Sequence, residues 1–205
     1  MSLDGTYTGL QASIASWLHR SDLTAIIPDL IVLAEARLAR DLRLRKMVTT
    51  TTSSTVASTQ GITLPADFLE IENLSVLTNP QRNPLYMNIE ALNVKFPAGT
   101  ANGTPSFYTL EGDQILFGPT PDAVYSINLM YYARLAALSV TPTNWLLTAH
   151  PNIYLFAALA EAGDYTANDE AVTKWERKTM LGIKTLQDAD DTAMFSGSSL
   201  RVRNI

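Results

Sequence analysis

Carboxylate and imidazole side chains are the groups of this chain that could take part in acid–base or metal chemistry. His19 and His150 each stand alone, with no second histidine or carboxylate at metal-ligand spacing. Glu35 lies among alanines, so burial could raise its pKa into the range of a general acid. A glycosidase needs two carboxylates, and none accompanies Glu35 at a recognisable spacing. A carboxylate-dependent cell-wall hydrolase is therefore an alternative hypothesis, and we expect no enzyme.

Other reactive groups form no recognisable motif. Asp188, Asp190 and Asp191 lack the alternating ligands and the glycine of a calcium loop. The serines and threonines of residues 49–55 lie in no Gly-x-Ser-x-Gly elbow, and the chain has no glycine loop that cradles phosphate. The absence of cysteine excludes disulfides, thiolate zinc sites and cysteine nucleophiles. We therefore expect no cofactor and no metal.

The charge feature that indicates a function is a basic cluster at the end of the second predicted helix. Five of the fifteen basic residues fall within ten positions: Arg37, Arg40, Arg43, Arg45 and Lys46. They could form a subunit–subunit salt-bridge surface, face DNA phosphates without reading sequence, or simply stabilise a helix C-terminus. A net charge of -5 argues against whole-surface attraction to nucleic acid. A helical DNA-binding module that uses Arg37 to Lys46 remains the second hypothesis.

Two amphipathic helices are predicted near the N-terminus, and the basic cluster begins within the second of them. The first covers about residues 6–19, and Ser21 or Asp22 could cap the turn that follows it. Pro28 suits the start of the second helix. The apolar stripe of that helix is formed by Ile27, Leu30, Ile31, Ala34, Leu38 and Leu42. Arg37 and Asp41 are expected to pair on its exposed side.

The middle of the chain has the pattern of short strands and turns. Strands are predicted near residues 47–52, 68–77, 107–110, 115–117 and 124–134, with a tight turn at 111–113 and a short helix at 88–95. Helix returns after Pro151 with a run that is apolar on every side, which is typical of a central helix. Gly163 is expected to end that helix, and Asn168 to cap the last one.

The predicted fold is α+β: a four-helix bundle from the N- and C-terminal helix pairs, a small β-rich insertion and an extended C-terminal arm. The domains expected are 1–46 with 150–195 (bundle), 47–149 (β-rich insertion) and 196–205 (flexible arm). A serine–glycine stretch at 196–199 precedes alternating apolar and basic residues. The first nine residues lack a signal-peptide pattern, and the longest apolar run is too short for a membrane span.

Several segments resemble one family of phage proteins, in the same order along most of the chain. The N-terminal half contributes residues 20–29 (RSDLTAIIPD), 33–38 (LAEARL) and 64–70 (LPADFLE). The C-terminal half contributes 131–139 (YYARLAALS) and 144–147 (NWLL). Together they resemble the head–tail adaptors of tailed bacteriophages, the gatekeeper or tail tubular protein A-like connectors.

This resemblance implies a non-enzymatic virion protein at the head–tail junction, assembled in the host cytoplasm. A ring of twelve subunits would bind the portal protein, with the next tail component (a nozzle or tail tube) on its other side. DNA would pass through the lumen, with non-specific contacts, and no membrane is involved. By position in the family, the portal-binding residues would be Leu200, Arg201, Val202, Arg203 and Ile205.

Overall fold

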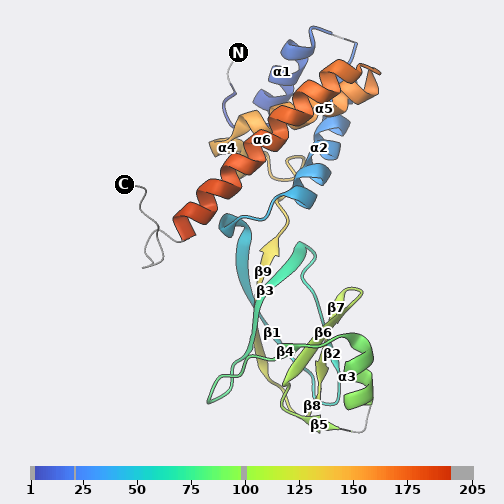
Figure 1. Cartoon of the computed structure of the whole chain (residues 1–205), viewed down its shortest axis with the longest axis vertical. Coiled ribbons are helices and arrows are strands. Elements are labelled where there is room, and N and C mark those ends of the chain that lie inside the picture. The colour runs from blue at the N-terminus through green and yellow to red at the C-terminus, as the bar shows by residue number, and fades with distance from the viewer. Residues whose placement is uncertain (1–2, 21, 98–100, 195–205) are drawn as a thin grey trace. The chain divides into compact units, whose positions relative to one another are not determined.

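Helices occupy the two ends of the chain and strands its middle (Figure 1). The structure is a computed structural model that describes residues 3–20, 22–97 and 101–194. The chain divides into a helical unit, Met1–Arg45 with Leu135–Ile205, and a β unit, Lys46–Arg134. The predicted arm at 196–205 lies outside the described residues. The fold is thus a mixture of helix and sheet, as α+β composition requires.

The N-terminal helices follow from local sequence signals. In α1 (Tyr7–Leu18) the hydroxyl of Thr6 accepts the backbone N–H of Gly9 at 3.1 Å, which caps an otherwise unpaired donor. A 3₁₀ turn (Thr24–Ile26) leads into α2 (Ile27–Asp41), and all six predicted stripe residues are buried. Of the two predicted caps, Asp22 is wrong, because its carboxylate binds Arg20 at 2.6 Å instead. The other, Ser21, lies outside the described residues.

The C-terminal helices of the helical unit are α4 (Trp145–Ala149), α5 (Pro151–Tyr165) and α6 (Asp169–Met194). As predicted for a central helix, α5 is contacted by α1, α2, α4 and α6. Gly163 does not end α5, which continues to Tyr165. A Cβ on Gly163 would lie 3.0 Å from the backbone nitrogen of Val172, so glycine lets α6 approach closely. Asn168 accepts the N–H of Ala171 at 3.1 Å, the predicted cap of α6.

The segment 135–149 belongs to the helical unit, whereas the sequence division placed it with the β region. Leu138, Leu146 and Leu147 are buried. The segment is also bound to α2, because the Leu138 N–H donates to Glu35 at 2.8 Å. Its apolar side chains therefore complete the core of the helices.

In the described part of the β unit, two main sheets are accompanied by one short helix. The first sheet has the order β1-β9-β3, and the second has the order β2-β7-β6-β4. Their strands are β1 (Val48–Ser54), β9 (Ser126–Ala133), β3 (Phe68–Val76), β2 (Gly61–Thr63), β7 (Gln114–Gly118), β6 (Phe107–Glu111) and β4 (Leu85–Tyr86). A 3₁₀ turn (Arg45–Met47) precedes β1, β5 (Asn102–Gly103) pairs with β8 (Thr120–Pro121), and α3 is Ile89–Lys95.

One hydrophobic core joins the two sheets of the β unit. Its buried members are Ile62, Leu74, Val76, Ile115, Phe117, Ile127, Leu129 and Tyr131. Residues 127, 129 and 131 of β9 face this core, because alternate side chains of a strand point to the same side of the sheet. The β6–β7 hairpin closes through Gly112 at φ +55°, a conformation that glycine adopts readily.

Candidate functional site: charged surfaces of the helical unit

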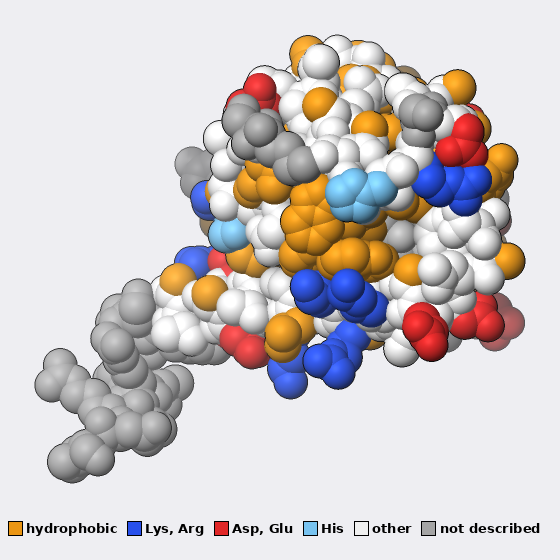
Figure 2. Space-filling model, turned by 90° about the horizontal axis from the view of Figure 1, so that it is seen from above, with side chains coloured by type: hydrophobic (Ala, Val, Ile, Leu, Met, Phe, Trp, Pro, Cys, Tyr) orange, Lys and Arg blue, Asp and Glu red, His pale blue; other side chains and the backbone are white. Residues whose placement is uncertain are grey.

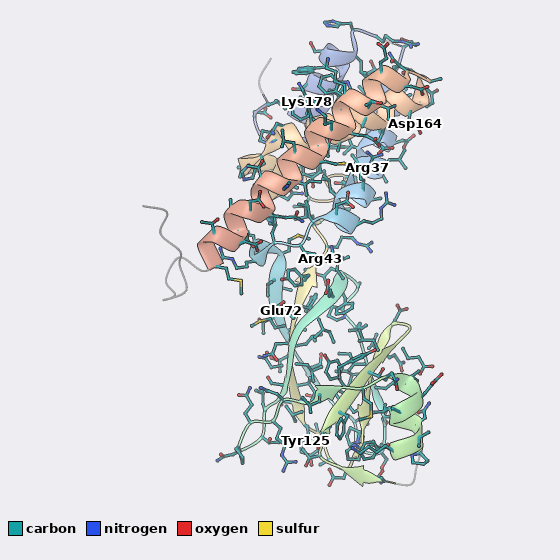
Figure 3. The ribbon with its side chains drawn as sticks, in the orientation of Figure 1. Arg37, Arg43, Glu72, Tyr125, Asp164 and Lys178 are labelled. Carbon is teal, nitrogen blue, oxygen red and sulfur yellow. The ribbon has the colours of Figure 1, made fainter. Side chains whose placement is uncertain are left out.

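Arg37 is the first member of the predicted basic cluster, and it lies on the flank of α2 that faces α6 (Figure 3). Its Nη1 is 2.9 Å from Glu176 of α6, and its Nη2 is 2.9 Å from Glu161 of α5. The Arg37 and Glu161 side chains are only 24% and 13% exposed. The predicted exposed pair with Asp41 is therefore wrong, because two carboxylates from distant helices bind Arg37 instead.

Other cluster members also bind groups within the helical unit. Arg43 Nη1 donates to the carbonyl oxygens of Ala39, at 2.9 Å, and Leu42, at 2.6 Å, which satisfies acceptors left open where α2 ends. Arg45 donates its backbone N–H and its Nε–H to the carboxylate of Asp190, each at 2.9 Å.

The contacts of Arg43 fit the alternative in which the cluster stabilises the C-terminal end of α2. Arg40 is exposed, and Lys46 belongs to the β unit. Arg37, Arg43 and Arg45 thus all have partners within the helical unit, and the Arg45 side chain is still 48% exposed.

Glu35 is partly buried and binds the backbone of the 135–149 segment. Its carboxylate accepts the Leu138 N–H, and burial raises its pKa while this hydrogen bond opposes the rise. Neither cause of the pKa shift is a second carboxylate. Burial also raises the pKa of Tyr154 to about 12, and its hydroxyl accepts Asn144 Nδ2–H at 2.8 Å. These groups fasten the 135–149 segment to the helices.

The histidines and the aspartates form no metal cage within the described ranges 3–20, 22–97 and 101–194. His19 is the left-handed C-cap of α1, with φ 52°, and His150 lies between α4 and α5. Asp190 is held by Arg45, as above. No helix among the described residues is both long and apolar enough to cross a membrane.

An aromatic cluster that is partly exposed, with lysines above it, was not recognised in the sequence. Trp17 of α1, Phe156 of α5 and Trp175 of α6 pack together, with ring centroids 5.4 to 6.2 Å apart. Lys174 Nζ lies 4.4 Å from the Trp175 ring centroid, and Lys178 Nζ lies 5.1 Å from that of Phe156. We call these five residues the aromatic–lysine patch. The spacing of Lys174 and Lys178 around Trp175 was its only sequence signal.

The aromatic–lysine patch is open to solvent in part. Trp17 is 42% exposed, and Phe156 and Trp175 are partly buried. Figure 2 shows hydrophobic side chains bordered by lysine and arginine side chains on the face of the helical unit seen there.

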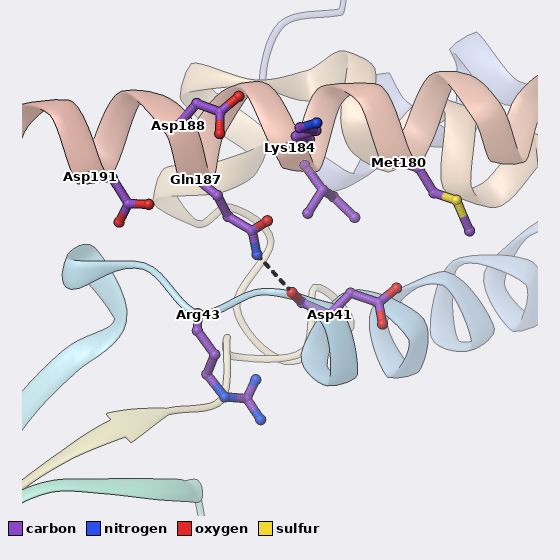
Figure 4. Close-up of a pocket in the computed structure, with 8 residues that line it drawn as sticks. Asp41, Arg43, Met180, Lys184, Gln187, Asp188 and Asp191 are labelled. Atoms are coloured by element: carbon purple, nitrogen blue, oxygen red, sulfur yellow. Dashed lines mark hydrogen bonds between the residues drawn. The ribbon is translucent and has the colours of Figure 1, made fainter.

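A groove of about 750 Å³ lies between the end of α2 and the second half of α6 (Figure 4). We call it the acidic groove, because carboxylates outnumber cations among its lining residues Asp41, Asp188, Asp191, Arg43, Lys184 and Met180. Gln187 Nε2 donates to the Asp41 carbonyl oxygen at 3.1 Å and connects the two walls. The three carboxylates make no ion pair among the described residues.

The helical unit thus has internal ion pairs, a fastened connecting segment and open charged surfaces, which alone do not identify a function. Comparison with protein families identifies the class more narrowly. The family model of the SU10 adaptor protein matches residues 5–203, so the chain belongs to this family of phage head–tail adaptors. The resemblance inferred from the sequence is therefore confirmed, and with it a structural virion role. A search of curated proteins gave no match.

Proposed function

We propose that this adaptor binds the portal ring, completes the head and provides the platform on which the tail is attached. The observation that carries this proposal is the family match, which spans both units of the chain. In this proposal α1, α2, α5 and α6 act as one four-helix bundle on the portal side, and the β unit faces the next tail component. Twelve copies would form a ring whose lumen lets DNA pass.

The internal contacts of the helical unit support a scaffold role. Arg37 joins α2 to α5 and α6, and Arg45 joins the chain after α2 to Asp190 near the end of α6. A platform that transmits load between head and tail benefits from such cross-links between helices. Because these guanidinium groups already have carboxylate partners, we do not propose the DNA-binding module as the function.

Portal binding is assigned to residues 200–205, which lie outside the described residues. An extended segment of alternating apolar and basic residues can add to a partner by backbone hydrogen bonds and side-chain pockets. The entropy that this segment loses when it becomes ordered is then compensated only by its contacts with the portal.

Deletion of residues 200–205 tests this assignment. We expect the truncated chain to keep the circular dichroism spectrum and unfolding temperature of the full chain, and to lose portal binding measured by calorimetry. A matched control replaces the same six residues by a scrambled order of equal composition and charge. Undiminished portal binding by the truncated chain would remove the assignment.

A further inference from the structure

We propose that copies of this chain associate head to tail, with the aromatic–lysine patch of one copy seated on the acidic groove of the next. This inference rests on the ring of the proposed function and names the surfaces that would form it. Both surfaces belong to the helical unit and share α6, with Lys174 and Lys178 in its first half and Asp188 and Asp191 near its end. A head-to-tail contact needs two different surfaces of this kind on one chain.

The C-terminal end of α6 carries negative charge that the helix dipole disfavours. A helix favours anions at its N-terminus and cations at its C-terminus. The first turn of α6 contains Asp169 and Glu170, which the dipole favours, whereas its last turn contains Asp191 and no basic residue. The carboxylates of Asp188 and Asp191 lie near its C-terminal end, and Asp41 is the last residue of α2. Cations supplied by a neighbouring copy would compensate this unfavourable arrangement.

The aromatic–lysine patch has the composition of a protein-binding surface. Trp is enriched among the residues that dominate binding energy at interfaces, and large rings bury much apolar area there. In this patch the lysines supply charge rather than apolar area. Leu181, one turn beyond Lys178, is 64% exposed, and Met180 in the acidic groove is 63% exposed. Each surface thus combines an apolar side chain with charges, and the signs of their dominant charges are opposite.

The two surfaces of one chain cannot meet each other. Lys178 and Asp188 are ten residues apart on a continuous helix, which is roughly 15 Å along its axis. The aromatic–lysine patch therefore requires a second molecule to reach an acidic groove. A contact between unlike surfaces closes into a ring if its rotation permits, as the proposed function requires.

Paired charge reversals test the contact. We expect Lys174→Glu with Lys178→Glu, or Asp188→Lys with Asp191→Lys, to weaken self-association at least about 100-fold in sedimentation, because like charges then face each other. A chain that carries all four changes keeps the net charge of -5 and should recover self-association. An equimolar mixture of the two double variants should also recover it. Arg82→Glu with Lys95→Glu in the β unit is the matched control and should have no effect.

Zero-length cross-linking gives a second, independent measurement on the wild-type chain. A carbodiimide joins a lysine to a carboxylate only when the two are in contact, so a Lys178–Asp188 link must be intermolecular. Links between Lys174 or Lys178 and Asp188 or Asp191 support the proposal. Lys184 and Asp188, four residues apart on α6, serve as the positive control for the reagent.

Three results would overturn the proposal. The first is that the wild-type chain neither self-associates nor forms these cross-links. The second is that the charge reversals leave self-association unchanged. The third is that the chain with all four substitutions does not recover self-association. Loss of salt-dependent duplex DNA binding by the Lys174→Glu and Lys178→Glu variant, with unchanged self-association, would assign the patch to DNA instead. Portal binding by that variant distinguishes failure of this contact from failure of the proposed function, since the monomer would still bind.

Discussion

Replacing Arg37 by alanine is the most direct test of how the helical unit is held together. The guanidinium bridges Glu161 and Glu176, both at 2.9 Å, and so connects three helices. Removing it leaves Glu161, whose side chain is 13% exposed, without a cation and close to a second carboxylate. The loss therefore combines a broken ion pair with a partly buried charge that has no partner.

The expected magnitude lies between two measured classes of ion pair. Breaking a fully buried pair destabilises a protein by about 3–5 kcal/mol, whereas an exposed pair contributes about 0–1 kcal/mol. Arg37 is 24% exposed and Glu176 is 37% exposed, so we expect about 2 kcal/mol. For a chain of this size, that corresponds to a fall in unfolding temperature of roughly 4–8 °C.

Urea unfolding followed by far-ultraviolet circular dichroism measures this loss. Arg40→Ala is the matched control, because Arg40 is exposed on the same helix, and we expect it to change stability by less than about 0.5 kcal/mol. A double-mutant cycle with Glu161→Ala isolates the pairwise interaction. A loss below about 0.5 kcal/mol for Arg37→Ala, or a coupling energy near zero, would refute the bridging role.

Two further predictions concern the attachment of the 135–149 segment. The pKa of Glu35 is raised above its ordinary 4.5 by burial, so the folded state disfavours its charge. The free energy of unfolding of the wild type should therefore rise as pH falls from neutral toward 4.5. Glu35→Gln keeps an acceptor for Leu138, so urea unfolding should show no such rise for this variant. At pH 7 its free energy of unfolding should match or exceed that of the wild type. Glu35→Ala loses the acceptor and should be about 1–3 kcal/mol less stable. Asn144→Ala removes both the α4 cap and the donor to Tyr154. Thermal unfolding should show a loss of stability of about 1–2 kcal/mol. Asn144→Asp keeps the cap and should lose less stability.

Elements whose signals are local could be predicted from the sequence. The stripe on α2 is buried, the short helix predicted at 88–95 is α3, Asn168 caps α6, and Gly112 lies in the predicted hairpin turn. Each of these features depends on residues within one or two turns of one another. The short strands β2, β4, β5 and β8 were missed because two or three residues carry no periodicity.

The partners of charged side chains could not be predicted, because they come from distant parts of the chain. Glu176 is 139 residues from Arg37, and Asp190 is 145 residues from Arg45. The sequence pattern offered only the neighbour Asp41 for Arg37. Gly163 was misread for the same reason, since its role is set by the approach of Val172 from α6.

The sequence by itself determined the helical ends, the β-rich middle and the family, because periodicity, caps and ordered motifs are properties of the chain alone. Only the tertiary structure decided which charges are held inside the helical unit and which face outward. The sequence left open whether the five basic residues form a subunit surface, face DNA or stabilise a helix end, and packing gives Arg37, Arg43 and Arg45 acceptors within the helical unit. The same packing brought together rings from three helices and placed two lysines above two of them, a juxtaposition that no local spacing specifies.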